Sequence, residues 1–191
     1  MPEDALHERI AACRICEATL PLGPRPVVRF SRTARILIIG QAPGTKVHES
    51  GVPWADDSGE RLREWMAIDE RDFYDPAMTA LVPMGFCYPG RGRSGDLPPR
   101  RECAPRWHEA VLDQLPEDRL TILIGIYAQA RYLPEEKKIT LAQRVRNHSA
   151  GGPVVALPHP SWRSTLFMRA NPWFEAETLP ALRSAVRARL S

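Results

Sequence analysis

The stretch from Ile36 to Gly44 constrains the fold more than any other part of this sequence. It reads Ile-Leu-Ile-Ile-Gly-Gln-Ala-Pro-Gly, an apolar run that ends in a turn rich in glycine and proline. A short, continuously apolar run is typical of a strand that is buried on both faces, as in a parallel sheet. Open α/β sheets place ligand sites at the carboxyl ends of such strands. We therefore predict that an active site begins at Gly40.

A second apolar run, at residues 154–157, ends in a comparable loop. This loop reads Pro-His-Pro-Ser-Trp-Arg and places His159 between two prolines. Taken alone, either loop is more often a plain turn, and a single histidine is more often a packed or surface residue. Parallel strands, however, bring their carboxyl ends to one edge of a sheet, so we expect the two loops to meet there.

The remaining apolar runs alternate with segments of helical period. Residues 78–82 and 120–125 predict two further strands, and the predicted helices cover residues 1–12, 59–66, 105–115, 126–133, 141–147, 164–170 and 174–190. Alternating strands and helices favour a parallel sheet covered on both faces. We predict an α/β fold with a four-stranded parallel sheet between helices, in a single domain that spans residues 1–191. We expect loops at residues 45–57, 69–76 and 90–100.

Composition limits the classes of protein that fit. The 191 residues are 43% hydrophobic and contain neither a run of eighteen apolar residues nor a charged and then apolar amino terminus. We therefore expect a cytoplasmic protein with no membrane partner. The net charge of +3 is too small to indicate a polyanionic partner, but five arginines lie within residues 91–106 beside Asp96 and Glu102. Such a stretch is either a solvated loop or a surface that follows phosphates.

The chain has four cysteines, at positions 13, 16, 87 and 103. Cys13 and Cys16 form a C-x-x-C motif, and disulfides are rare in cytoplasmic proteins. Four thiols suit a tetrahedral zinc ion and an iron-sulfur cluster equally well on count alone.

The two loop motifs resemble those of the uracil-DNA glycosylase superfamily. Residues 40–44 match its first motif, and His159-Pro160-Ser161 match its second. Residues 85–90, 94–99 and 171–174 are similar to segments of a bacterial branch known only as uracil-DNA glycosylase-like, so the resemblance covers nearly the whole chain. It implies the uracil-DNA glycosylase fold and a monofunctional hydrolase that removes uracil, or another deaminated base, from DNA in base excision repair. We expect a monomer.

The resemblance also bears on the cysteines. The family 4 branch binds a four-iron, four-sulfur cluster through an amino-terminal C-x-x-C and two later cysteines, which flank a loop as Cys87 and Cys103 do here. It therefore implies a 4Fe-4S cluster at Cys13, Cys16, Cys87 and Cys103, with zinc as the alternative. The cluster would be structural and would join the amino terminus to the arginine-rich loop.

The departing base needs charge stabilisation and a stacking surface. The resemblance implies that His159, in its neutral form, donates to the uracil O2, together with backbone amides of the turn at Gly40 and Ala42. Residues 51–54, Gly-Val-Pro-Trp, resemble a G-x-P-F segment that places an aromatic ring against the flipped base. Trp54 is therefore the predicted platform, and a core tryptophan that closes the loop is the alternative.

The group that activates water is less well defined by sequence. Superfamily members with an acidic residue in the first motif use that carboxylate, but this chain has Gln41 and Ala42 there. We expect Gln41 or Glu49 to serve, with Asp56 as the next choice. The alternative is that water attacks an already formed sugar cation with little help from the protein. We predict that Asp57 instead caps the helix at 59–66, with Glu60 completing a capping box.

A further departure concerns the base. Many members carry an asparagine that reads the uracil edge, and residues 78–90 contain none. We therefore expect a pocket that either reads uracil through backbone groups or also admits other deaminated bases such as hypoxanthine or xanthine. For DNA, we expect contacts from Ser161, Trp162, Arg163, Arg91 and Arg93, with Arg100 and Arg101 adding charge.

Two other classes of function compete with a glycosylase. The first is a non-catalytic protein that binds damaged bases or abasic sites, which Gln41, Ala42 and Pro83 favour because the usual polar groups are missing. The second is a hydrolase of free nucleosides, against which the arginine-rich loop argues.

Overall fold

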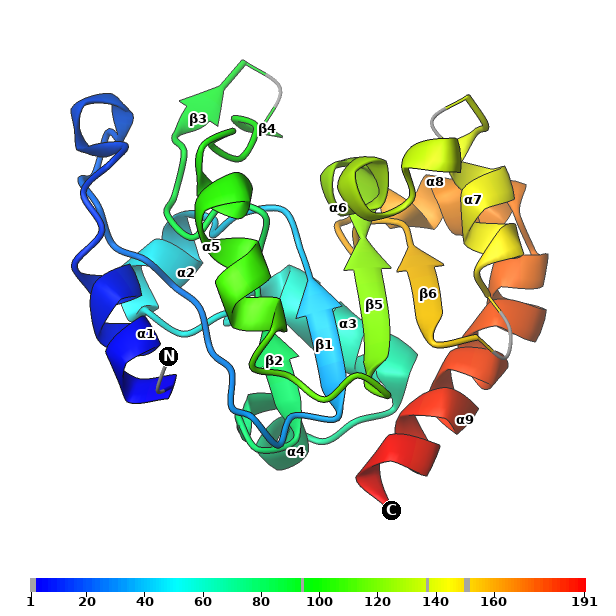
Figure 1. Ribbon diagram of the computed structural model, residues 1–191. Coiled ribbons are helices and arrows are strands. Elements are labelled where there is room, and N and C mark those ends of the chain that lie inside the picture. Colours follow the sequence, from blue (N-terminus) through cyan, green and yellow to red (C-terminus); the bar gives the residue numbers. More distant parts are fainter. Residues whose placement is uncertain (1–2, 94, 137, 150–151) are drawn as a thin grey trace.

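A computed structural model describes residues 3–93, 95–136, 138–149 and 152–191. Its central sheet contains strands β1 (Ile36–Ile39), β2 (Thr79–Leu81), β5 (Leu120–Ile124) and β6 (Val154–Leu157). All neighbouring pairs are parallel and the order is β2-β1-β5-β6 (Figure 1). The predicted α/β class and the predicted four-stranded parallel sheet are therefore confirmed.

The helices lie on both faces of this sheet. Their bounds are α1 (Glu3–Ala11), α2 (Thr45–Ser50), α3 (Asp57–Met66), α4 (Glu70–Tyr74), α5 (Cys103–Leu112), α6 (Gly125–Tyr132), α7 (Leu141–Asn147), α8 (Ser164–Ala170) and α9 (Leu179–Leu190). Two 3-10 turns lie at Glu17–Thr19 and Pro134–Glu136, and a π-helical turn lies at Phe174–Thr178. In the part of the chain that the structure describes, no helix has the length and apolar character needed to cross a membrane.

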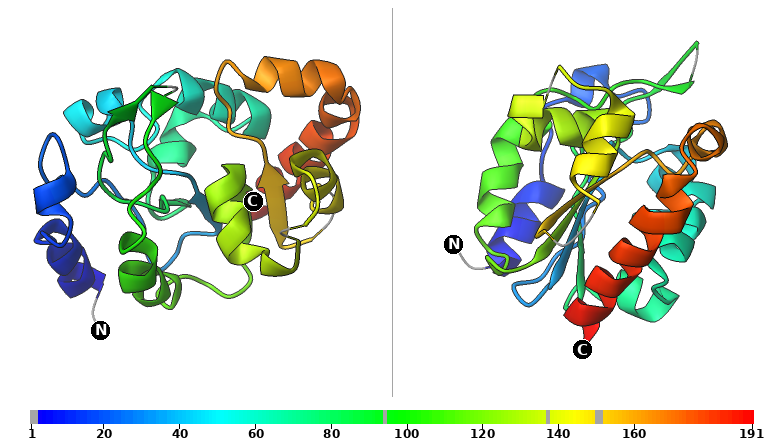
Figure 2. Two further views of the ribbon diagram at one scale, coloured as in Figure 1. Left: turned by 90° about the horizontal axis from the view of Figure 1, so that it is seen from above. Right: turned by 90° about the vertical axis from the view of Figure 1, so that its right-hand side faces the viewer.

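The side chains of β1 alternate between the two faces of the sheet, and each face is covered by a layer of helices. All four of its side chains are buried, and successive side chains of a strand point to opposite faces. Ile36 and Ile38 pack with residues of α3, α4 and α9, whereas Leu37 and Ile39 pack with residues of α1, α5 and α6. The second view of Figure 2 shows these two groups of helices on opposite sides of the sheet.

The structure corrects the three segments predicted as loops. Residues 45–57 contain α2, which ends where Gly51 adopts a left-handed φ of 72°. Residues 69–76 contain α4, whose first turn is capped by the Asp69 side chain. Residues 90–100 contain a small antiparallel hairpin of β3 (Arg91–Gly92) and β4 (Gly95–Asp96). Elements this short have too few residues to show a hydrophobic period.

Two predicted helix starts are also wrong. Asp56, and not Asp57, caps α3, because its extended backbone lets the side chain accept from the Gly59 N–H at 2.9 Å. Asp57 is the first helical residue and is exposed, with its carboxylate 2.7 Å from Lys46 Nζ. Helix α5 begins at Cys103 and not at Pro105. Proline is tolerated there because the first turn of a helix has no intrahelical partner for its N–H groups.

Candidate active site

The loops that follow β1 and β6 meet at the carboxyl edge of the sheet, as the sequence predicts. Residues 40–44 and His159 line one narrow pocket, which we call the inner pocket. Its other lining residues include Pro53, Trp54, Asp56 and Pro83. A wider hollow, which we call the outer hollow, opens beside it. Three residues line both spaces and mark their boundary, namely Gln41, Ala42 and His159.

His159 is partly buried and faces the inner pocket. Its ring lies 5.9 Å, between centroids, from the ring of Trp54. Burial lowers the pKa of His159, while the charge of Asp56 acts in the opposite direction. The ring makes no hydrogen bond to any residue that the structure describes. A neutral imidazole at this place therefore presents one free N–H donor to a ligand.

Trp54 lies in the left-handed region, with a φ of 59°. Its ring covers Gly40 so closely that a Cβ at Gly40 would lie 2.6 Å from the tryptophan Cζ2. The Trp54 carbonyl accepts a hydrogen bond from the Tyr74 hydroxyl at 3.1 Å, and Arg63 donates to that hydroxyl at 3.1 Å. Such support is what a sparsely populated backbone conformation requires. Trp54 also packs on the core, so the two interpretations of this residue are compatible.

The three candidates for the water-activating group are placed differently. Gln41 lines both the inner pocket and the outer hollow. Its backbone carbonyl accepts a hydrogen bond from the Gly85 N–H at 3.0 Å. Asp56 lines the inner pocket, with one carboxylate oxygen committed to the cap of α3. Glu49 is exposed on α2, and neither space includes it. The structure therefore does not bring Glu49 to the site.

Asp96 is a neighbour that sequence reasoning missed. It lies at the end of the β3–β4 hairpin and lines the outer hollow. Its Oδ2 approaches the first loop, since a Cβ at Gly44 would lie 3.4 Å away. Partial burial raises the pKa of Asp96, Arg91 lowers it and Asp56 adds to the rise. The only signal in the sequence was an acidic residue within a stretch of arginines.

Two other residues that the sequence did not indicate fix the walls of the site. Arg61 on α3 donates to the Ser161 carbonyl at 2.6 Å and thereby holds the loop that follows β6. His108 on α5 lies 2.9 Å from the Pro83 carbonyl through Nε2 and 2.5 Å from the Tyr132 hydroxyl through Nδ1. Because a carbonyl only accepts, Nε2 carries the proton. Burial lowers the pKa of His108 to about 4, so this link is neutral at pH 7.

The residues predicted to contact DNA lie on the rim of the site. Ser161 and Arg163 line the outer hollow, and Trp162 is 70% exposed, with the Arg163 guanidinium 5.3 Å from its ring centroid. Arg91 and Arg93 are exposed on the hairpin, which lies at the same edge of the sheet (Figure 1). Ser94, part of the segment 94–99, lies outside the described residues. Arg100 differs, because it pairs with Glu102 at 3.4 Å and lines the cysteine pocket.

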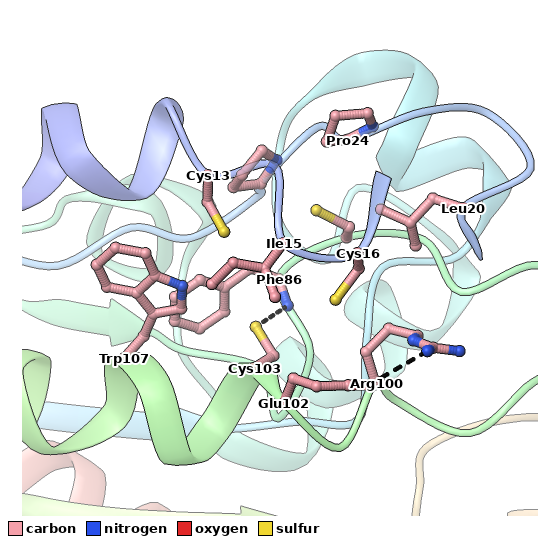
Figure 3. A pocket seen from close by; sticks show the side chains of 12 residues that line it. Cys13, Ile15, Cys16, Leu20, Pro24, Phe86, Arg100, Glu102, Cys103 and Trp107 are labelled. Atoms are coloured by element: carbon pink, nitrogen blue, oxygen red, sulfur yellow. Dashed lines mark hydrogen bonds and ion pairs between the residues drawn. The ribbon is translucent and has the colours of Figure 1, made fainter. Parts of the chain in front are cut away.

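All four cysteines line a second, separate pocket. Figure 3 shows the sulfur atoms of Cys13, Cys16 and Cys103 facing this space. The Phe86 N–H donates to the Cys103 sulfur at 3.2 Å. Burial raises the pKa of Cys87 to about 11 and that of Cys103 to about 12. Among the described residues, no three Cys, His, Asp or Glu side chains are arranged to hold a single metal ion.

Comparison with protein families gives a match that covers both loops of the site. The model of the Uracil DNA glycosylase superfamily matches residues 28–183. This range is most of the chain, and it includes all four strands of the central sheet and both loops of the inner pocket. Cys13 and Cys16 precede the matched range, so the match does not bear on the complete set of cysteines.

Proposed function

Since the chain belongs to the uracil-DNA glycosylase superfamily, we propose that it hydrolyses the N-glycosidic bond of uracil in DNA, as a monofunctional glycosylase of base excision repair. The observation that carries this proposal is the pairing of a neutral, otherwise unbonded His159 with the glycine-rich turn across one pocket. Cleavage of the bond leaves an anion on the base and positive charge on the sugar. A pocket that offers donors without a fixed positive charge suits the departing base.

The base side of the reaction uses His159 and the turn. The electron pair of the bond between C1′ and N1 leaves with uracil, and charge accumulates on O2. His159 donates its N–H to that oxygen, and backbone amides between Gly40 and Ala42 add to the stabilisation. The neutral form is suited to this role because its N–H is present in both the ground state and the transition state, so no proton has to be taken up first.

Base recognition depends on stacking more than on a side-chain amide that hydrogen-bonds to the edge of the base. Trp54 supplies an aromatic face beside His159, where it can replace the stacking that a flipped base loses. The wall that carries asparagine in many relatives here carries Pro83, whose carbonyl already accepts from His108. We propose that uracil is accepted, and that hypoxanthine or xanthine is also processed because no side-chain amide at this wall selects against them.

Gln41 is the side chain that we assign to positioning the water. It lies at the boundary between the inner pocket and the outer hollow, where the bond between base and sugar has to lie. Asp56 is less suited, because one of its oxygens already accepts from the Gly59 N–H. Glu49 is exposed on α2 and lines neither space, so we do not assign it this role.

Deoxyuridine in a labelled oligonucleotide, opposite guanine or unpaired, provides the test of this function. Incubation with the protein followed by alkali is expected to cleave the strand at the uracil, and parallel substrates with hypoxanthine and xanthine measure base preference. No cleavage on any of the three, with lesion-strand binding retained, would instead support the non-catalytic binder that the missing asparagine and first-motif acid favour. Release of uracil from free deoxyuridine would support a nucleoside hydrolase.

The arginines of the hairpin provide a prediction about DNA binding. We propose that Arg91 and Arg93 contact phosphates, together with Ser161, Trp162 and Arg163 at the opposite rim. Replacing both hairpin arginines with glutamine is expected to weaken binding for every sequence and to reduce the slope of log K against log salt by about 2. Fluorescence anisotropy at several salt concentrations measures this slope. Arg189→Gln, at the carboxyl end of α9, is the control and should leave it unchanged.

We also propose that the four cysteines hold a 4Fe-4S cluster with a structural role. All four cysteines line one pocket, which four thiol ligands of either a cluster or a zinc ion require, and the resemblance to the family 4 branch favours the cluster. The donated Phe86 N–H is typical support for a ligating sulfur. Such a cluster would join the segment after α1 to the start of α5.

Metal analysis tests the cluster directly. Protein purified without oxygen is expected to contain about four iron atoms and four acid-labile sulfides per chain, and Cys103→Ser is expected to lose most of both and to melt at a lower temperature. Ser31→Ala, at an unrelated turn, should retain both. Stoichiometric zinc without iron would contradict the cluster and support the tetrahedral alternative.

A further inference from the structure

The two spaces of the active site divide the substrate between them. The inner pocket is narrow and carries Trp54 and the His159 ring, so it suits the planar base. The outer hollow is wider and is lined by Ser161 and Arg163, which suits the sugar and its phosphates. Gln41, Ala42 and His159 line both spaces. The bond that breaks therefore lies at this shared boundary, and the attacking water has to approach from the side of the outer hollow.

Asp96 and Asp56 lie on different sides of this boundary. Asp56 lines only the inner pocket, and its carboxylate accepts the Gly59 N–H in the cap of α3. Asp96 lines only the outer hollow, and its Oδ2 lies beside Gly44 at the end of the first loop. Within the described residues, Asp96 is the acidic side chain that faces the sugar side of the site.

An acidic residue is unfavourable at this position for DNA binding alone. The rim otherwise carries Arg91, Arg93 and Arg163, and the substrate is a polyanion. A carboxylate among them repels phosphates. Partial burial raises the pKa of Asp96, and the charge of Asp56 adds a smaller contribution to the rise. Asp96 is exposed and pairs with Arg91 in the hairpin through its backbone, but its side chain makes no hydrogen bond within the described structure that would explain it as a support for the hairpin. A role of the Asp96 carboxylate in the chemical step would explain why a negative charge lies at this place.

We propose that Asp96 is a catalytic residue that accepts a proton from the attacking water and faces the positive charge on the sugar. This inference rests on the proposed glycosylase function. In the step, the water oxygen forms a bond to C1′ and the C1′–N1 bond breaks with its electron pair leaving on the base. One water proton passes to the Asp96 carboxylate, and the uracil anion accepts the His159 N–H as a hydrogen bond. The products are an abasic sugar and the uracil anion. Asp96 later returns its proton to solvent, and the anion takes up one proton from solvent on release to give free uracil.

The test compares Asp96→Asn with Asp96→Glu on one uracil-containing oligonucleotide. Single-turnover rates at saturating protein isolate the chemical step, and anisotropy measures the dissociation constant separately. Asp96→Asn is expected to slow excision about 100-fold, while its DNA affinity stays equal or increases because a repulsive charge is removed. Asp96→Glu keeps a carboxylate and is expected to retain a larger share of the rate. Melting temperatures of both variants should match the parent, since the side chain is exposed.

A matched control separates this role from a general effect of charge. Asp118→Asn makes the same charge change at an exposed site that pairs with Arg189 at 3.8 Å, and should leave the excision rate unchanged.

The outcomes distinguish this inference from the proposed function. If the parent protein excises uracil and Asp96→Asn does so at the same saturated rate, Asp96 has no chemical role and the glycosylase function stands. Loss of affinity with an unchanged saturated rate also overturns the inference, as would an equal loss in Asp96→Glu and Asp96→Asn. If the parent excises no base at all, the proposed function fails and this inference fails with it.

Discussion

Replacing His159 with alanine is expected to slow uracil excision at saturating protein by about 100- to 1000-fold, the effect of removing one preorganised donor from a developing anion. The ring faces the inner pocket, makes no hydrogen bond to a described residue and is held neutral because burial lowers its pKa. Alanine removes the donor and leaves the turn amides to stabilise the base alone. Quantification of alkali-cleaved oligonucleotide in single-turnover experiments measures the loss.

Other residues of the site provide the comparison for His159. Gln41→Ala is expected to lower the rate by a smaller factor, because it orients a neutral water and not a charged atom. Glu49→Ala is expected to leave the rate nearly unchanged, because Glu49 is exposed on α2 and outside both spaces. Equal losses of excision rate in all three variants would show that the substitutions act by disturbing the structure of the site, and not by removing a hydrogen-bond donor at His159.

The central sheet could be predicted from the sequence because its strands are continuously apolar. Residues 36–39 and 155–157 are buried, and such strands leave the same pattern in any parallel sheet. Short elements left no comparable pattern. Helices α2 and α4 have six and five residues and carry mostly polar side chains, so capping and tertiary contacts decide their conformation more than a hydrophobic period does.

The site could be predicted in part, for a related reason. His159 and the turn at 40–44 follow strands directly, so their meeting at one edge follows from parallel pairing alone. Asp96, Arg61 and His108 come from a hairpin and from helices whose placement over the sheet depends on packing. On sequence alone, Glu49 ranks above Asp56 as the carboxylate that activates water. Residue spacing cannot correct this order, because it does not show which way a short helix presents its side chains.

Gly59 is expected to be the least replaceable residue outside the chemistry. It is the third residue of α3, where alanine normally stabilises a helix by up to about 1 kcal/mol relative to glycine. Here a Cβ would overlap the Trp54 carbonyl oxygen and lie 2.7 Å from the carbonyl carbon. Gly59→Ala is therefore expected to destabilise the protein by about 1–3 kcal/mol, the range for overpacking, and so reverse the sign of the helix effect.

The same substitution should also impair excision, because relief of the clash requires Trp54 to move. That residue holds a left-handed backbone, bonds to Tyr74 and places its ring against Gly40 and beside His159. Thermal unfolding measures the stability change, at about 2–4 °C for each kcal/mol in a chain of this size, and the single-turnover assay measures the rate. Ser58→Ala, one position earlier in the helix, is the control and should change neither. A Gly59→Ala protein with raised stability and a normal rate would show that Trp54 is not fixed by this contact, and that the aromatic wall of the pocket is set by the loop alone.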